Sequence, residues 1–223
     1  MVSIKKSLVT VAYGEIYRRI VSLKYEPGRQ LYEQNLMDDL SIGRTPIREA
    51  LCNLASDMLI ESQPNKGVIV RPVTLQNTKA VFAALETLEL GIVKQAMINN
   101  ITSHLQAMEQ ANASMTKAVE DMDIYALVDS NNSFHTSFSR CSNNVYLVEA
   151  LRKVRCEANR LAYLSFANGI KTEQSLRAHY KRVMAQHDEI ILYLREQREE
   201  ELKKVLLQHI IDFKKRIIEY LAS

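Results

Sequence analysis

In the first third of the chain, short stretches with apolar residues at helical spacing are separated by residues that favour turns. Four apolar residues share one helix face and predict a first helix that ends at Pro27-Gly28; they are Val11, Ile16, Ile20 and Leu23. A second, short helix fits Glu33 to Leu40. Ser41 to Arg44 then predicts a turn. In the third helix we expect Thr45 as the N-cap and Pro46 as the first position, where a missing N–H leaves no hydrogen bond unmade.

The third helix is followed by a strand pattern. Its predicted buried stripe consists of Ile47, Leu51 and Leu54. Two short apolar runs, 59–62 and 68–71, flank a turn with Pro64 early and Gly67 late. The order helix, helix, turn, helix, hairpin is that of a winged helix-turn-helix.

The rest of the chain is a series of long helical patterns with short polar links. The expected helices are 75–98, 102–118, 121–141, 145–168, 174–196 and 199–221. Short links make consecutive helices antiparallel, which predicts an all-α bundle. We therefore expect a mainly α protein, with a winged helix-turn-helix DNA-binding domain over 1–73 and a helical effector-binding and dimerisation domain over 74–223.

Composition narrows the class of protein. The 6 glycines and 4 prolines in 223 residues supply few tight turns for an all-β fold. The 3 cysteines form no CxxC pair, and no stretch approaches the ~18 apolar residues of a membrane-spanning helix, so we expect a cytoplasmic protein. The net charge of +3 neither indicates nor excludes a nucleic-acid partner.

The start of the third helix and the hairpin tip carry the candidate DNA contacts. The second helix of a helix-turn-helix presents its first residues to base edges, where Arg48 could bond guanine O6 and N7. Arg44 and Thr45 are better placed for the phosphate backbone. Taken singly, each arginine is more often a solvated surface residue. The full candidate set is Arg44, Thr45, Ile47, Arg48, Lys66 and Gly67.

Three segments resemble a family of bacterial regulators: Tyr25-Glu26-Pro27-Gly28, then Gly43-Arg44-Thr45-Pro46-Ile47-Arg48-Glu49-Ala50-Leu51, then Pro64-Asn65-Lys66-Gly67-Val68. The chain is similar over nearly its whole length to GntR-family transcription regulators of the FadR-like branch, which carry a helical FCD effector domain. Gly43 stands where the family more often has Ser. The resemblance implies a homodimer that binds a short inverted-repeat operator in double-stranded DNA and responds to a small-molecule effector.

Three histidines interrupt apolar stripes of the helical part: His135, His187 and His209. Asn131 shares a helix face with His135. His187 and His209 are equidistant from Arg198, in the link between the last two helices, and each stands ~16 Å along its helix. An antiparallel pair brings them to one level, where neutral imidazoles could bind Zn or another divalent transition metal. The alternative is that each is a core histidine bonded to a neighbour.

The resemblance adds a ligand set to this pattern. FCD domains commonly bind a metal through Asp or Asn and three His, an arrangement matched by Asn131, His135, His187 and His209. Zn or Ni is the expected ion, with Mn or Fe as alternatives. Asn131 supplies no anionic ligand, so the metal should be held more loosely than by Asp.

The resemblance also implies an effector carboxylate held by an arginine in an R-x-x-L-E pattern. Here that pattern runs from Leu85 to Glu89, with Leu85 in place of the arginine. Arg152 and Arg155, with Asn159 one turn further, could supply the charge instead, although such a pair is more often part of a solvated or interface stripe.

Predictions for three further residues complete the description of the effector pocket. Tyr180 lies within ~20° of the face of His187 and is a candidate pocket wall. We expect His104 and His179 at the surface.

Two other functions compete with a ligand-controlled regulator. His135, His187-Asp188 and Asp212 echo the H…HD…D ligand order of HD-type phosphohydrolases, which are metal-dependent enzymes. However, Asp188 lies ~100° around the helix from His187, toward the polar face. A regulator with a ligand-free helical dimerisation scaffold is the other alternative. We expect no enzyme.

Overall fold

The structure is a computed structural model that describes residues 7–64, 67–169 and 173–222. Contacts divide the chain into two compact units, Met1–Thr74 and Leu75–Ser223. We call them the N-terminal unit and the helical unit. The division falls one residue from the boundary expected from the sequence.

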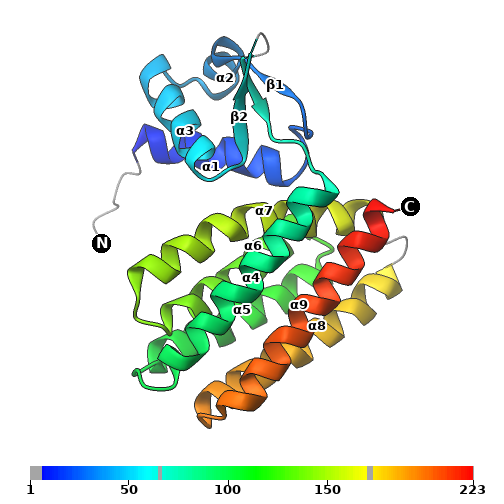
Figure 1. The fold of residues 1–223 in the computed structure, drawn as a ribbon. Helices are drawn as coiled ribbons and strands as arrows, with labels where there is room; N and C mark the ends of the chain where they lie inside the picture. Colours follow the sequence, from blue (N-terminus) through cyan, green and yellow to red (C-terminus); the bar gives the residue numbers. More distant parts are fainter. Residues whose placement is uncertain (1–6, 65–66, 170–172, 223) are drawn as a thin grey trace. The chain divides into compact units, whose positions relative to one another are not determined.

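The N-terminal unit is a winged helix-turn-helix, as predicted (Figure 1). Its elements are α1 (Leu8–Val21), β1 (Gln30–Leu31), α2 (Glu33–Leu40), α3 (Arg44–Ser56), β2 (Ile60–Gln63) and β3 (Gly67–Val70). The three strands form an antiparallel sheet in the order β1-β3-β2. Strand β1 was not predicted, because a two-residue strand is too short to show an alternating pattern.

The core of the N-terminal unit lies between α1 and α3, which pack together. Ile16 and Ile20 of α1 and Ile47 and Leu54 of α3 are each 0% exposed. Between α2 and α3, Ser41 adopts a left-handed conformation with φ 53° and ends α2. This conformation stops the helix within one residue, so that α3 can start in a new direction.

The start of α3 corrects one sequence prediction. Gly43 is the N-cap, with an extended backbone and no side-chain capping bond, so Thr45 is the second helical residue and not the cap. Pro46 is then third in the helix. It is tolerated there because the N–H groups of a first helical turn have no acceptor within the helix.

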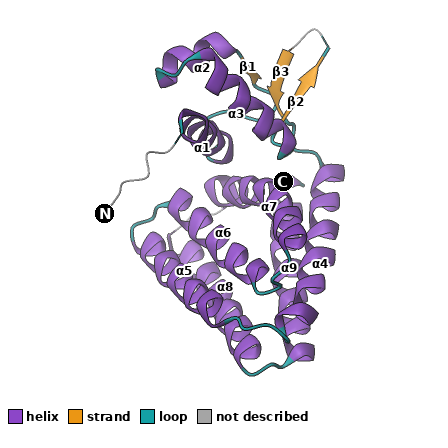
Figure 2. Ribbon diagram, turned by 90° about the vertical axis from the view of Figure 1, so that its left-hand side faces the viewer, coloured by secondary structure: helices purple, strands orange, loops and turns teal. Residues whose placement is uncertain are grey.

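The helical unit is an all-α bundle (Figures 1 and 2). Its helices are α4 (Leu75–Ala96), α5 (Thr102–Glu120), α6 (Ile124–Arg140), α7 (Val145–Gly169), α8 (Glu173–Arg195) and α9 (Glu199–Leu221). In this bundle α6 packs between α5 and α7, and α9 packs against α4, α7 and α8. None of the described helices is long and apolar enough to span a lipid bilayer.

In the helical unit, the predicted helix ends agree with the observed ends to within three residues. The largest shift is at α6, which begins at Ile124 because Asp123 caps it, accepting a hydrogen bond of 2.9 Å from the amide of Ala126. An aspartate cap of this kind satisfies one of the free N–H groups at a helix start. In the N-terminal unit, α1 ends at Val21, before the Pro27-Gly28 stop that the sequence predicted.

Candidate functional site

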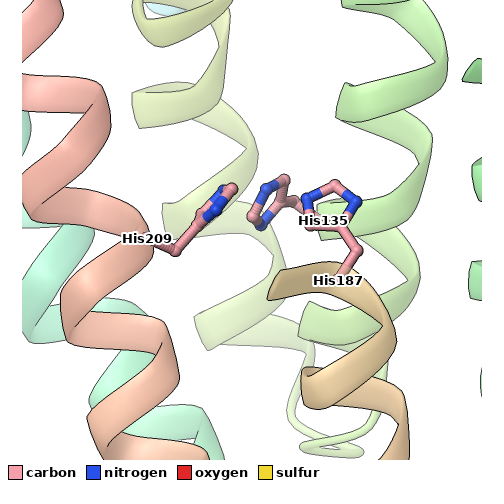
Figure 3. Close-up of side chains that lie close together, drawn as sticks. All are labelled: His135, His187 and His209. Carbon is pink, nitrogen blue, oxygen red and sulfur yellow. The ribbon is translucent and has the colours of Figure 1, made fainter. Parts of the chain in front are cut away.

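Three imidazoles meet in the interior of the helical unit (Figure 3). His135 comes from α6, His187 from α8 and His209 from α9, and Figure 3 shows their rings gathered between the three helices. One ring nitrogen from each residue lies within 4.8 Å of the other two. The ring centroids are 5.0 to 5.3 Å apart. The fold thus brings together the three histidines that the sequence predicted to meet.

Some ring nitrogens of this cluster have no hydrogen-bond partner among the described residues. His135 and His187 are 0% exposed and His209 is 8% exposed. Both ring nitrogens of His135 and Nε2 of His187 have no hydrogen-bond partner among the described residues. A buried polar atom without a partner costs about 1–3 kcal/mol, so the cluster suits a ligand that the protein atoms do not supply.

The imidazoles are held in their neutral form. Burial, together with the charge of Arg155 and the neighbouring histidines, lowers the pKa values of His135 and His187 well below 6.5. Burial also lowers the pKa of His209 to about 4. Neutral imidazole is the form that binds a metal ion, so no proton has to be displaced near pH 7.

A chain of hydrogen bonds orients His187. Its Nδ1 donates to Oδ1 of Asn112 at 2.9 Å, and the Asn112 amide nitrogen donates to Oδ1 of Asp188 at 3.0 Å. Because Asn112 Oδ1 can only accept, the proton of the ring is on Nδ1 and the lone pair is on Nε2. The ring also stacks on Phe134, with centroids 3.7 Å apart and planes 5° apart.

His209 is oriented by a second chain of the same kind. Its Nδ1 donates to Oε1 of Gln186 at 2.8 Å, and the Gln186 amide donates to Oδ2 of Asp212 at 2.8 Å. Nε2 of His209 therefore also carries the lone pair. Such outer contacts fix the ring orientation and the tautomer of metal-binding histidines. Asp188 and Asp212, which suggested a hydrolase, act here through an amide and not as ligands.

His135 is the least constrained of the three. Its Nδ1 lies 3.4 Å from Oε1 of Glu89, beyond the 2.7–3.2 Å of a good N–H···O bond. Glu89 is 0% exposed and pairs with the buried Arg155. Glu89 thus already balances the charge of Arg155. The sequence had suggested that this charge binds the carboxylate of an effector.

A cavity of about 40 Å³ adjoins the histidines. Of the predicted residues it is lined by Asn131, Arg155, Tyr180 and His209. The structure does not bring Arg152 and Asn159 to it. Arg152 turns outward and pairs with Glu149 at 2.8 Å, and Asn159 is buried elsewhere on α7.

Among the cavity residues that the sequence did not predict are His179 and Arg216. The expectation that His179 is a surface residue is wrong: it is half-buried, and burial with the nearby arginines lowers its pKa to about 3. His104 is half-buried on α5, away from the cavity. Arg216 could have been found by periodicity, since it follows His209 by seven residues and so shares its helix face.

In the N-terminal unit, the start of α3 exposes three of the predicted DNA contacts. Arg44, Thr45 and Arg48 are exposed, and Arg44 has no hydrogen bond or ion pair within the described ranges. The prediction that Ile47 contacts DNA is wrong. Its side chain is 0% exposed and packs in the core, so it cannot reach DNA. It belongs to the stripe that attaches α3 to the rest of the unit.

The hairpin between β2 and β3 carries the remaining candidates. Gly67 is exposed and has φ 68°, a conformation that favours glycine. Lys66 lies outside the described residues.

Comparison with protein families gives two matches that together cover most of the chain. A model described as FCD domain matches residues 80–212. A model described as bacterial regulatory proteins, gntR family, matches residues 8–70.

Similar proteins carry the names of transcriptional regulators. The HTH-type transcriptional repressor RspR of Escherichia coli strain K12 is 22% identical over 167 residues, or 75% of this chain and 73% of that protein. The Nta operon transcriptional regulator of Aminobacter aminovorans is 24% identical over 203 residues, or 91% of each chain.

Solved structures share the fold. E. coli McbR/YncC has a TM-score of 0.82 at 19% identity, covering 97% of this chain and 100% of that one. Lar, which controls the expression of the Listeria monocytogenes agr system, has a TM-score of 0.62 at 16% identity, covering 97% and 99%.

Proposed function

The chain belongs to the GntR family of bacterial transcriptional regulators with an FCD domain, and we propose that a divalent metal ion and a small-molecule effector in its helical unit control how it binds operator DNA. The observation that carries this proposal is the convergence of three buried, neutral histidines, two of which are oriented with their Nε2 lone pairs free. The family consists of transcriptional regulators, so the phosphohydrolase alternative falls away.

The residues that would hold the metal are His135, His187 and His209, through ring nitrogens, with the amide oxygen of Asn131 as a fourth ligand. Zn or Ni is favoured over Mn or Fe because a site of given nitrogen and oxygen ligands binds Mn²⁺ and Fe²⁺ more weakly. When bound, the ion supplies a positive centre to which an anionic oxygen can bind. All four side chains are neutral, so the ion would keep its full charge toward the cavity.

DNA binding is assigned to the exposed start of α3 and to the hairpin. Arg48 would bond a base edge in the major groove, and Arg44 and Thr45 would bind phosphates beside the N-terminus of α3, which has no side-chain capping bond. Lys66 and Gly67 would contact the backbone from the wing. A two-fold homodimer presents two such surfaces, so the operator should be an inverted repeat.

Control by an effector requires that the ligand has different affinities for two arrangements of the dimer. A ligand that binds both arrangements equally shifts nothing. The helical unit would therefore act by favouring one arrangement of the two DNA-binding units.

Native mass spectrometry of the full chain, purified without chelator, tests the proposal. We expect a dimer with about one Zn or Ni ion per chain, and loss of the ion in His187→Ala and in His209→Ala. His104→Ala is the matched control, because His104 lies away from the cavity. A metal-free dimer that takes up no added zinc would support the ligand-free scaffold instead.

A further inference from the structure

His135 differs from the other two histidines in what fixes the position of its ring proton. In each of the others an amide oxygen accepts that proton: Nδ1 of His187 donates to Asn112. Nδ1 of His209 donates to Gln186 in the same way. The ring of His135 makes no hydrogen bond to any residue that the structure describes. No amide therefore decides which of its two nitrogens keeps the lone pair.

Glu89 on α4 is a buried acceptor that is only partly used. Its side chain is 0% exposed, and its Oε1 accepts a hydrogen bond from Nη2 of Arg155. Its Oε2 is buried and has no partner within the described ranges. Each oxygen of a carboxylate can accept about two hydrogen bonds, and a buried one that accepts none is costly. Glu89 can thus accept a further hydrogen bond.

The ring without an acceptor and the carboxylate with spare acceptors are neighbours. Nδ1 of His135 lies 3.4 Å from Oε1 of Glu89, slightly beyond the ~2.7–3.2 Å of a good N–H···O bond. If the ring proton were on Nε2, the lone pair of Nδ1 would face a carboxylate oxygen and the two would repel each other. A proton on Nδ1 is attracted to that oxygen instead. Glu89 therefore favours the tautomer of His135 whose lone pair is on Nε2.

Arg155 on α7 holds the carboxylate in this position. Helices α4 and α7 pack together, and the side chains of Glu89 and Arg155 are 0% and 5% exposed. Glu89 is not among the residues that line the cavity beside the histidines, so its carboxylate is not open to a ligand there. Its nearest use is to hold the ring of His135.

We propose that Glu89 is a positioning residue of the metal site: its carboxylate accepts a hydrogen bond from Nδ1 of His135, so that Nε2 of this ring binds the ion. The inference rests on the proposed function and adds to it a residue that is not a ligand. A carboxylate behind a metal-binding imidazole makes the ring a more basic ligand. Glu89 would thus supply negative charge that Asn131, as a neutral ligand, does not.

NMR of the zinc-loaded full chain with ¹⁵N-labelled histidine tests the inference on the wild type. The nitrogen shifts identify the ring atoms that bind zinc, and long-range correlations to hydrogen identify those that carry a proton. We expect three zinc-bound rings, each coordinated through Nε2 and protonated on Nδ1. Only two such rings, with His135 bound through Nδ1, would overturn the inference.

Glu89→Gln removes the charge of the acceptor and keeps an oxygen near its place. The Nδ1 proton of His135 should then resonate at lower ppm, because a hydrogen bond to an amide is weaker than one to a carboxylate. The Nδ1 protons of the other two zinc-bound rings should not move. Zinc affinity, measured by competition with a chelator, should fall about 10–100-fold.

Glu157→Gln is the matched control. Glu157 pairs with the fully buried Arg160 at 2.6 Å and makes no hydrogen bond or ion pair with the three histidines among the described residues. The control therefore breaks a buried ion pair of the same kind and should bind zinc as the wild type does. Equal losses of zinc affinity in the two variants would overturn the inference. A folded Glu89→Gln chain with the zinc affinity of the wild type would do the same.

The failure of the metal proposal would look different. In that case no zinc-bound ring would appear in the spectrum at any zinc concentration. Glu89 acts on His135 without the metal, so the zinc-free chain should also carry the ring proton of His135 on Nδ1. The ring is identified there by its response to Glu89→Gln. A proton on Nε2 of His135 in the zinc-free chain would overturn the inference whether or not zinc binds.

Discussion

Glu33, at the start of α2, holds Arg48 of α3 through both of its carboxylate oxygens, each 2.9 Å from Nε of the arginine. The side chain of Arg48 is 60% exposed, and an exposed ion pair contributes only about 0–1 kcal/mol to stability. The contact therefore does little for the fold. It fixes the direction of the guanidinium and leaves both terminal nitrogens without a partner among the described residues.

Substitution of Arg48 should reduce specific DNA binding. Arg48→Ala is expected to cost about 1–3 kcal/mol on an operator selected from random duplexes, and to relax the preference at one base pair of each half-site. Fluorescence anisotropy at a fixed salt concentration measures both effects. An equal loss on operator and scrambled duplex would show instead that Arg48 binds phosphate.

Arg44 should behave differently, because we assign it to the phosphate backbone. Arg44→Ala should weaken binding to all duplexes to a similar degree and reduce the slope of log K against log salt concentration by about 1 for each half-site. A loss restricted to the operator would contradict this assignment.

Because Glu33 holds Arg48 in one direction, removing this contact should reduce the discrimination between operator and non-specific DNA. Glu33→Gln should raise affinity for scrambled duplexes, since a negative charge near the DNA is lost, and should lower the ratio of specific to non-specific affinity. Asp38→Asn is the control: it removes an equal charge from the same helix, where Asp38 accepts a hydrogen bond from Gln34 and, among the described residues, from no other side chain. If both variants change the ratio equally, Glu33 does not position Arg48.

The amide that orients His209 should matter for metal affinity although it binds no metal. Gln186→Ala is expected to weaken zinc binding about 10–100-fold, as measured by competition with a chelator of known affinity. Gln208→Ala is the matched control, because Gln208 also donates to Asp212 but makes no side-chain hydrogen bond to His209 among the described residues. Unchanged zinc affinity in Gln186→Ala would remove this residue from the site.

The buried pair of Glu89 and Arg155 should be important for stability. Glu89→Ala leaves a buried cation without its partner and should lower the free energy of unfolding by about 3–5 kcal/mol in urea denaturation. Glu149→Ala breaks the more exposed pair with Arg152 and should cost no more than about 1 kcal/mol. Similar losses in the two variants would contradict the placement of the Glu89 pair in the interior.

The sequence predicted the fold class and the long helices because each has many turns of regular apolar spacing. It missed β1, which has two residues, and misplaced the cap of α3, because Thr45 and Gly43 are both acceptable N-caps. Ile47 was assigned both to the buried stripe and to the DNA contacts. One side chain cannot occupy both faces of a helix, and burial decided for the core.

For the cavity, the sequence predicted the meeting of His187 and His209 from their equal distances to one turn. The sequence could not show that Glu89 balances the charge of Arg155, because the two residues lie on different helices and are 66 positions apart in the chain. The same limit explains why the sequence suggested Arg155 and missed Arg216. Which cation lacks a counter-charge depends on contacts between helices and not on spacing along one helix.

The most direct test of ligand control is the dissociation constant of the full chain for its selected operator in three states: metal-free, zinc-loaded, and zinc-loaded with saturating acetate as a probe for a carboxylate effector. Coupling between sites usually changes affinity by 5-fold to 150-fold. We predict a change of at least about fivefold between the metal-free state and one of the ligand-bound states. Dissociation constants that agree within about twofold in all three states would contradict the account.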